Sequence, residues 1–184
     1  AIASLMSDIE REVIALPDLQ RPFVWEDTKV RDLLDSLFVG FPVGTLVFWH
    51  TSNDKDARAL GAERPGLRAT TLVIDGQQRL TTLSLLFAAV YHSIKPHEKE
   101  LEDRHKAKLF TLMWRLVLEA HDDQIRVIPQ IQNNNHNDYR AVLAEIGVIG
   151  ACDAPAYAGN RKIFRAFRYF QSRIEEVTDG QDNR

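Results

Sequence analysis

The stretch VIDGQQRLTTLSLL, residues 73–86, constrains the fold of this chain more than any other. A β-rich apolar run stops at Asp75-Gly76, and from Gln78 onward leucines recur at the spacing of an amphipathic helix. A glycine and four polar side chains therefore stand between a strand and a helix that are both apolar enough to be buried. The pattern predicts a strand, a tight turn and a helix that begins directly after the turn.

The segment before this unit predicts a second helix and strand. Residues 26–42 show one apolar stripe at helical spacing, with Asp27 or Thr28 as the cap and Gly40 at the end. Residues 43–50 are β-rich and apolar, which predicts a buried strand. The stripe consists of Val30, Leu33, Leu34, Leu37 and Phe38.

The chain changes character after Pro96. Charged and then apolar helical patterns follow, including an Asn-capped helix closed by Gly147 and a last helix over residues 159–177. We therefore expect an α+β fold. Its core, a small sheet packed with helices, covers residues 1–95, and a helical extension of the same domain covers residues 96–184.

Charge and composition exclude several classes of protein. The formal net charge is −3, so any contact with DNA must use a local basic patch. The single cysteine, Cys152, excludes an internal disulfide framework and fits a reducing compartment. No apolar run reaches the length of a bilayer span and no signal peptide is present, so we expect a cytoplasmic protein with no membrane partner.

The turn at residues 75–79 carries the chemistry of an anion site. A helix that begins there presents unpaired N–H groups and roughly half a positive charge. Gly76 allows a ligand to approach, and Arg79 can add a bidentate cationic contact to phosphate. Gln77 and Gln78 can orient water or an oxyanion, and Asp75 could hold a divalent metal or polarise a water. The structural alternative is an ordinary Asp-Gly turn in which Asp75 only caps the helix.

Two further polar clusters are candidates for function. Gln20 and Arg21 lie in a proline-braced loop, and the alternative is a surface loop in which Arg21 pairs with a local carboxylate. Arg161, Arg165 and Arg168 form a stripe on the last helix that could grip DNA phosphates. For this stripe we favour the solvated face of an amphipathic helix.

Other reaction classes lack their motifs. The sequence contains no GxxxxGK[ST] phosphate loop, no HxH or HExxH spacing and no GxSxG elbow. A histidine metal site and nucleophilic hydrolase chemistry are therefore not expected.

The two polar clusters together carry a family resemblance. LPDLQRPFVW, then SLFVGFPVGTLVFW, then LVIDGQQRLTTL resemble the N-terminal domain of GmrSD-type proteins, within the wider ParB/sulfiredoxin-like superfamily. The resemblance is close from about Ser4 to Tyr91, and GNRKIFRAFRYF also resembles a family helix. Leu16 and Leu19 stand where isoleucine and an aromatic residue are common.

This resemblance implies a bacterial antiphage defence protein that restricts foreign, often modified, DNA. It implies a nucleoside-triphosphate-hydrolysing domain of the ParB type, with Mg²⁺ as the expected metal and DNA cleavage in a separate HNH-type nuclease domain or subunit. In that implied site Asp75, Gln77, Gln78 and Arg79 are catalytic. Its nucleotide-binding residues are Gln20, Arg21, Gly76 and Thr81.

Two functions follow as hypotheses. The first is an NTP-hydrolysing regulatory domain of a restriction system. The alternative is a non-enzymatic module that senses DNA or its modifications through the arginine stripe and docks a nuclease.

Overall fold

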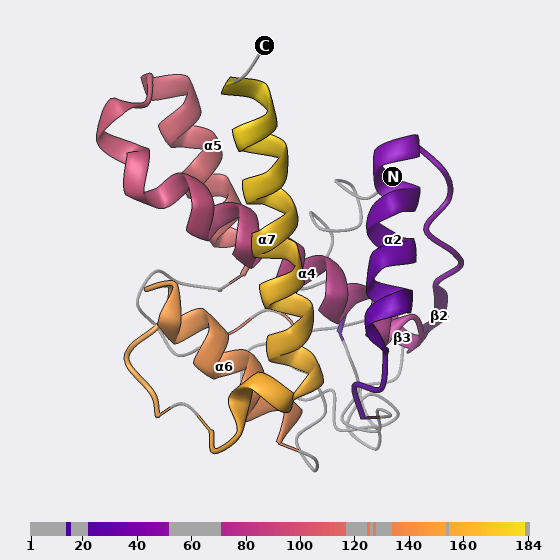
Figure 1. The fold of residues 1–184 in the computed structure, drawn as a ribbon. Helices are drawn as coiled ribbons and strands as arrows, with labels where there is room; N and C mark the ends of the chain where they lie inside the picture. Colours follow the sequence, from indigo (N-terminus) through magenta and orange to yellow (C-terminus); the bar gives the residue numbers. More distant parts are fainter. Residues whose placement is uncertain are drawn as a thin grey trace.

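A computed structural model of the chain describes residues 14–15, 22–51, 71–116, 125, 127, 134–153 and 155–182. Figure 1 shows helices gathered around one long central helix, with a small sheet at one side. The α+β fold is therefore confirmed. The elements in chain order are β1 (Ile14–Ala15), α2 (Asp27–Val39), β2 (Val47–His50), β3 (Thr71–Asp75), α4 (Gln77–Ile94), η1 (Lys95–Glu100), α5 (Asp103–Trp114), α6 (Asn135–Glu145), η2 (Ala158–Asn160) and α7 (Lys162–Asp182).

The sheet has three strands in the order β1-β3-β2. The central strand β3 pairs in parallel with β1 and antiparallel with β2. Leu72 and Val73 on β3 are fully buried, which confirms the strand predicted before the turn. Because β3 is the middle strand, its end at Asp75 is a fixed point from which α4 starts.

The strand predicted over residues 43–50 is shorter and more exposed than expected. Only residues 47–50 form β2, and all four are exposed. Within the described sheet β2 lies at the edge, and a register irregularity separates Val47 from Phe48. The prediction of a buried strand was wrong because apolar β-formers fit an edge strand as well as a central one.

Helix α2 matches its prediction except for its N-cap and the exposure of Phe38. Val30, Leu33 and Leu34 are buried, and Gly40 ends the helix with a φ of +79°. The N-cap is Glu26 and not Asp27 or Thr28, and it makes no side-chain capping bond. Phe38, the last residue of the predicted stripe, is 64% exposed.

Helix α4 is the centre of the hydrophobic core. Its buried residues include Leu80, Leu83 and Leu85, and α7 packs along it more extensively than any other described element. Figure 1 shows α7 crossing in front of α4. The buried hydroxyls of Ser84 on α4 and Tyr139 on α6 form a hydrogen bond. This placement fixes the first turn of α4 against the rest of the fold.

The core does not stop at the predicted boundary between residues 95 and 96. One buried cluster contains Phe23, Val30 and Leu85 together with Phe167 and Phe170. The division into residues 1–95 and 96–184 stays a prediction, and apolar packing crosses it. None of the helices within the described ranges is both long and apolar enough to cross a lipid bilayer.

Candidate functional site

The turn between β3 and α4 is formed by one glycine. Gly76 is the N-cap of α4, with φ +112° and ψ 4°, and no side chain makes a capping bond there. The exposed carboxylate of Asp75 thus does not cap the helix, and the structural alternative for this residue is not realised. Positive φ costs glycine little, so the chain can turn directly from strand to helix.

The loop that joins α2 to β2 lies against this turn. A Cβ built on Gly76 would lie 2.1 Å from Cδ2 of Leu46, which is far inside van der Waals contact. A side chain at position 76 would therefore need both a positive φ and a shift of the flexible Leu46 side chain.

Arg79 lies between the turn and the same loop. Its guanidinium donates a hydrogen bond to the carbonyl oxygen of Thr45. It also packs on Gly44, where a built Cβ would lie 2.7 Å from Nε of Arg79. Among the ion pairs of the described residues, none involves Arg79. A half-buried, permanent positive charge therefore stands beside the start of α4 with a neutral oxygen as its acceptor.

Gln77 folds back onto the strand that precedes it. Its Nε2 donates to the carbonyl oxygens of Val73 and Ile74, each at 3.0 Å. This amide nitrogen stabilises the turn from within, because it supplies donors to strand carbonyls at the end of β3.

Gln78 connects the turn to Pro22 and Val24. Its Nε2 donates to the carbonyl of Pro22 at 2.8 Å, and its Oε1 accepts the N–H of Val24 at 2.9 Å. Gln20 and Arg21 lie outside the described residues, so their predicted place at the site is untested. Pro22 follows Arg21 directly, and the bond to Gln78 brings that end of the loop to the first turn of α4.

Thr81 has a different environment from its neighbours. It is 3% exposed, so its side chain is enclosed by protein and does not reach the surface of the turn. The contact between Thr81 and a nucleotide stays a prediction.

The arrangement favours an anionic ligand. Uncapped N–H groups and the helix dipole attract negative charge, and Arg79 adds a full positive charge beside them. No group of three or more metal-ligating side chains occurs in the described part of the chain. Asp75 alone could supply one carboxylate to Mg²⁺, which commonly takes one or two protein carboxylates plus phosphate oxygens. The residues present thus fit a nucleotide-bound Mg²⁺ better than a metal held by protein alone.

The three arginines of the predicted stripe are ion-paired, and Arg161 directly precedes α7 whereas Arg165 and Arg168 lie on it. Arg161 donates to the buried Asp138 on α6 at 2.9 Å, Arg165 pairs with Asp27, and Arg168 pairs with Glu145 at 2.6 Å. Arg165 and Arg168 are exposed, which agrees with the solvated face that we favoured, and Arg161 is half-buried. Each partner belongs to another element, so the three arginines are not a row of uncompensated cations. They fasten α7 to α2 and α6.

The ion pair between the buried Asp138 and Arg161 changes the pKa of the Asp138 carboxyl. Burial raises the pKa of Asp138, and the neighbouring Arg161 guanidinium lowers that pKa in part. Burial is the larger effect, so the ion pair does not fully offset the cost of removing the charge from water.

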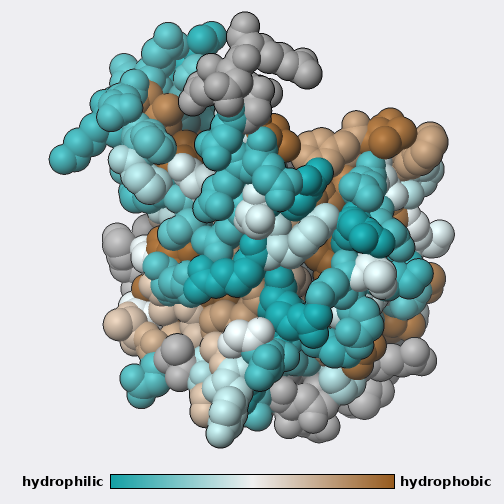
Figure 2. Space-filling view, in the orientation of Figure 1, coloured by the Kyte–Doolittle hydropathy of each residue, from teal (hydrophilic) through white to brown (hydrophobic). Residues whose placement is uncertain are grey.

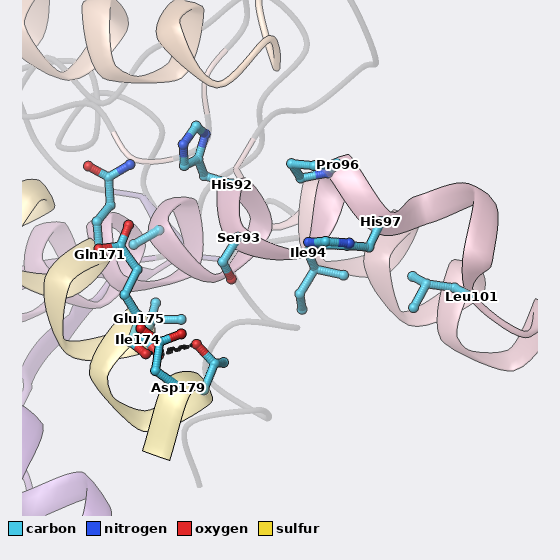
Figure 3. Close-up of a pocket in the computed structure, with 12 residues that line it drawn as sticks. His92, Ser93, Ile94, Pro96, His97, Leu101, Gln171, Ile174, Glu175 and Asp179 are labelled. Carbon is cyan, nitrogen blue, oxygen red and sulfur yellow. Dashed lines mark hydrogen bonds between the residues drawn. The ribbon is translucent and has the colours of Figure 1, made fainter. Parts of the chain in front are cut away.

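A separate pocket lies near the other end of α4. Figure 3 shows His92, His97, Glu175 and Asp179 around a pocket of about 610 Å³ between α4, η1 and α7. Ser93 in this pocket is 16 residues from Gln77, which is about 24 Å along a helix. The pocket is therefore not part of the turn.

Sequence reasoning missed the loop residues that complete the turn. Gly44 and Leu46 contact it, and Thr45 accepts from Arg79. The signal that could have found them is Gly44 itself, since a glycine just before a strand often marks a close approach of two backbones.

Comparison with known proteins identifies the family of this chain. The family described as GmrSD restriction endonuclease, N-terminal domain, matches residues 2–182. A relative from Methanocaldococcus jannaschii, the uncharacterized protein MJ0686, is 33% identical over 87 residues. That alignment covers 42% of this chain and 14% of the relative, so this chain spans a small part of that protein.

Proposed function

The chain belongs to the family of GmrSD restriction endonuclease N-terminal domains, and from that premise we propose that it binds and hydrolyses a nucleoside triphosphate to regulate DNA restriction. The observation that carries the proposal is the uncapped first turn of α4 with Arg79 beside it. A terminal phosphate is the ligand whose charge and oxygen geometry suit backbone N–H groups and a guanidinium together.

In the proposed site each residue of the turn has its own role. The N–H groups after Gly76 bind phosphate oxygens, and Arg79 exchanges its bond with the Thr45 carbonyl for a stronger one with the anion. Asp75, the exposed carboxylate at the end of β3, holds the metal or the attacking water. When bound, Mg²⁺ neutralises charge on the phosphates.

The proposal places the restriction chemistry elsewhere. It assigns DNA cleavage to an HNH-type nuclease domain or subunit, which the nucleotide state of this domain would control. Direct DNA binding through Arg161, Arg165 and Arg168 is not advanced, because each of these arginines already has a carboxylate partner.

The test measures nucleotide binding and phosphate release. Each of the four common ribonucleoside triphosphates is titrated with Mg²⁺ by calorimetry, and phosphate release is followed separately. We expect Arg79→Ala to weaken binding by about tenfold or more, which is the usual scale for a lost charge-assisted contact to phosphate.

The matched control is Arg104→Ala. Arg104 is a surface arginine on α5 that is paired with Glu102, so this variant makes the same change of charge away from the turn. Circular dichroism checks that both variants fold. Equal affinity in wild type and Arg79→Ala, or no binding of any triphosphate by wild type, would reject the proposal.

A further inference from the structure

The segment Pro22–Val24 is held by side chains from two distant helices. Gln78, in the first turn of α4, bonds the Pro22 carbonyl and the Val24 N–H through the two ends of one amide. Lys162, the first residue of α7, donates to the carbonyl of the same Val24 at 3.1 Å and pairs with Glu26. Between the two bonded residues, Phe23 is 5% exposed and belongs to the core.

This arrangement fixes position and direction together. One hydrogen bond permits a segment to pivot, whereas two bonds to one planar amide set its orientation as well. Val24 is 53% exposed, so its place depends on these polar bonds more than on burial of its own side chain.

We infer that Gln78 is a positioning residue, which attaches the segment Pro22–Val24 to the first turn of α4, and that Lys162 attaches Val24 from α7. The nucleotide part of this inference rests on the proposed function, because Gln78 lies in the first turn of α4, where we propose that the phosphate binds. The attachment itself does not depend on any ligand.

Three substitutions separate the parts of the attachment. Gln78→Met keeps the length of the side chain and removes both bonds. Gln78→Glu keeps an acceptor for the Val24 N–H but places a carboxylate oxygen against the Pro22 carbonyl. Gln77→Met is the matched control, because it removes the neighbouring amide, which bonds β3 and not the loop.

The first measurement is hydrogen exchange of the Val24 amide in the whole chain. We expect Gln78→Met to speed this exchange by about tenfold or more, because the N–H loses its acceptor. Lys162→Met should produce a smaller rise and Gln77→Met none. If Val24 exchanges at the wild-type rate in a folded Gln78→Met protein, the inference is wrong. Should Gln78→Met not fold, Gln78→Ala, which also removes the acceptor of the Val24 N–H, provides the same comparison.

The second measurement is the kinetics of phosphate release. A positioning role predicts that Gln78→Met raises KM by about tenfold while kcat changes by less than about threefold. A fall in kcat at unchanged KM would assign Gln78 to the reacting atoms and overturn the inference. If wild type shows no turnover, the proposed function fails, and the exchange result still decides the attachment.

Discussion

At the scale of single residues, the turn depends on a glycine that has no room for a side chain. Gly76 combines a φ of +112° with a built Cβ that would lie 2.1 Å from Leu46. Gly40 also has a positive φ, +79°, but nothing lies within 4 Å of its built Cβ. Substitution of Gly40 therefore tests backbone strain alone, whereas substitution of Gly76 tests backbone strain together with steric conflict.

Gly76→Ala should destabilise the fold more than Gly40→Ala. The φ of +112° at Gly76 lies outside the left-handed helical region and costs a residue with a side chain about 1–3 kcal/mol, whereas the φ of +79° at Gly40 lies near that region and costs about 1 kcal/mol. Rotation of the flexible Leu46 side chain can relieve the clash, so the clash adds little. Urea denaturation followed by circular dichroism measures both free energies of unfolding. Equal losses in the two variants would contradict this order.

The buried carboxyl of Asp138 should make stability depend on pH. Its pKa in the folded chain is raised above the ordinary 3.8, so the folded chain binds this proton more tightly than the unfolded chain does. The contribution of Asp138 to the free energy of unfolding therefore falls as the pH rises from 3.8 through the raised value.

Asp138→Asn removes that titration. The free energy of unfolding of wild type, minus that of the variant, should decrease as the pH rises above about 4. Urea titrations at several pH values measure the difference. A difference that stays constant or grows with pH would mean that Arg161 outweighs burial.

At the scale of elements, ion pairs join α7 to its neighbours in unequal environments. The side chain of Asp138 is 4% exposed and that of Glu145 is 34% exposed. Removing an arginine from a buried carboxylate leaves a charge without compensation, whereas water replaces a partner that is lost at the surface.

Arg161→Ala should therefore cost more stability than Arg168→Ala. We expect about 1–3 kcal/mol for Arg161→Ala, because the buried charge loses its donor. Arg168→Ala should cost about 0.2–1 kcal/mol plus a small loss of contact with the Phe167 ring. Thermal and urea unfolding of both variants measure the order. The reverse order would contradict the assignment.

The sequence predicted elements well where a periodic pattern and a breaker coincided. The strand at residues 71–75 and the helix that follows Gly76 were predictable because an apolar run, a glycine and a leucine spacing agree. The burial of β2 was not predictable, since its position at the edge of the sheet depends on which strand pairs with β3. Likewise, the spacing of the arginines in α7 indicates one helix face but not which carboxylates face it.

The candidate site was predictable in part for the same reason. The order of local residues such as Gly76 and Arg79 in the chain indicates an anion site. The contacts of Thr45 with Arg79 and of Pro22 with Gln78 join segments 34 and 56 residues apart. Such contacts depend on tertiary packing, which periodicity does not report.

At the scale of the whole molecule, one apolar core contains residues from both halves of the chain. Val30 and Leu85 share a buried cluster with Leu109, Phe167 and Phe170. Residues 1–95 by themselves thus lack the helices that cover the buried face of α4.

A fragment of residues 1–95 should therefore not fold cooperatively. Without α7, the buried face of α4 would stand in water, and each large apolar side chain exposed there costs about 1.5–3 kcal/mol. Far-UV circular dichroism during heating compares the fragment with the full chain. A sharp transition in the fragment would show that residues 1–95 form a domain by themselves.

The apolar side chains that stay outside the core have a practical consequence. Figure 2 shows brown surface gathered where α2 ends, and Phe38, Val39 and Phe41 are each 64–66% exposed. Such groups favour self-association as the protein concentration rises, because each contact between two molecules removes these side chains from water. Light scattering and sedimentation across a dilution series belong before any calorimetric titration, so that heat from self-association is not mistaken for heat from a ligand.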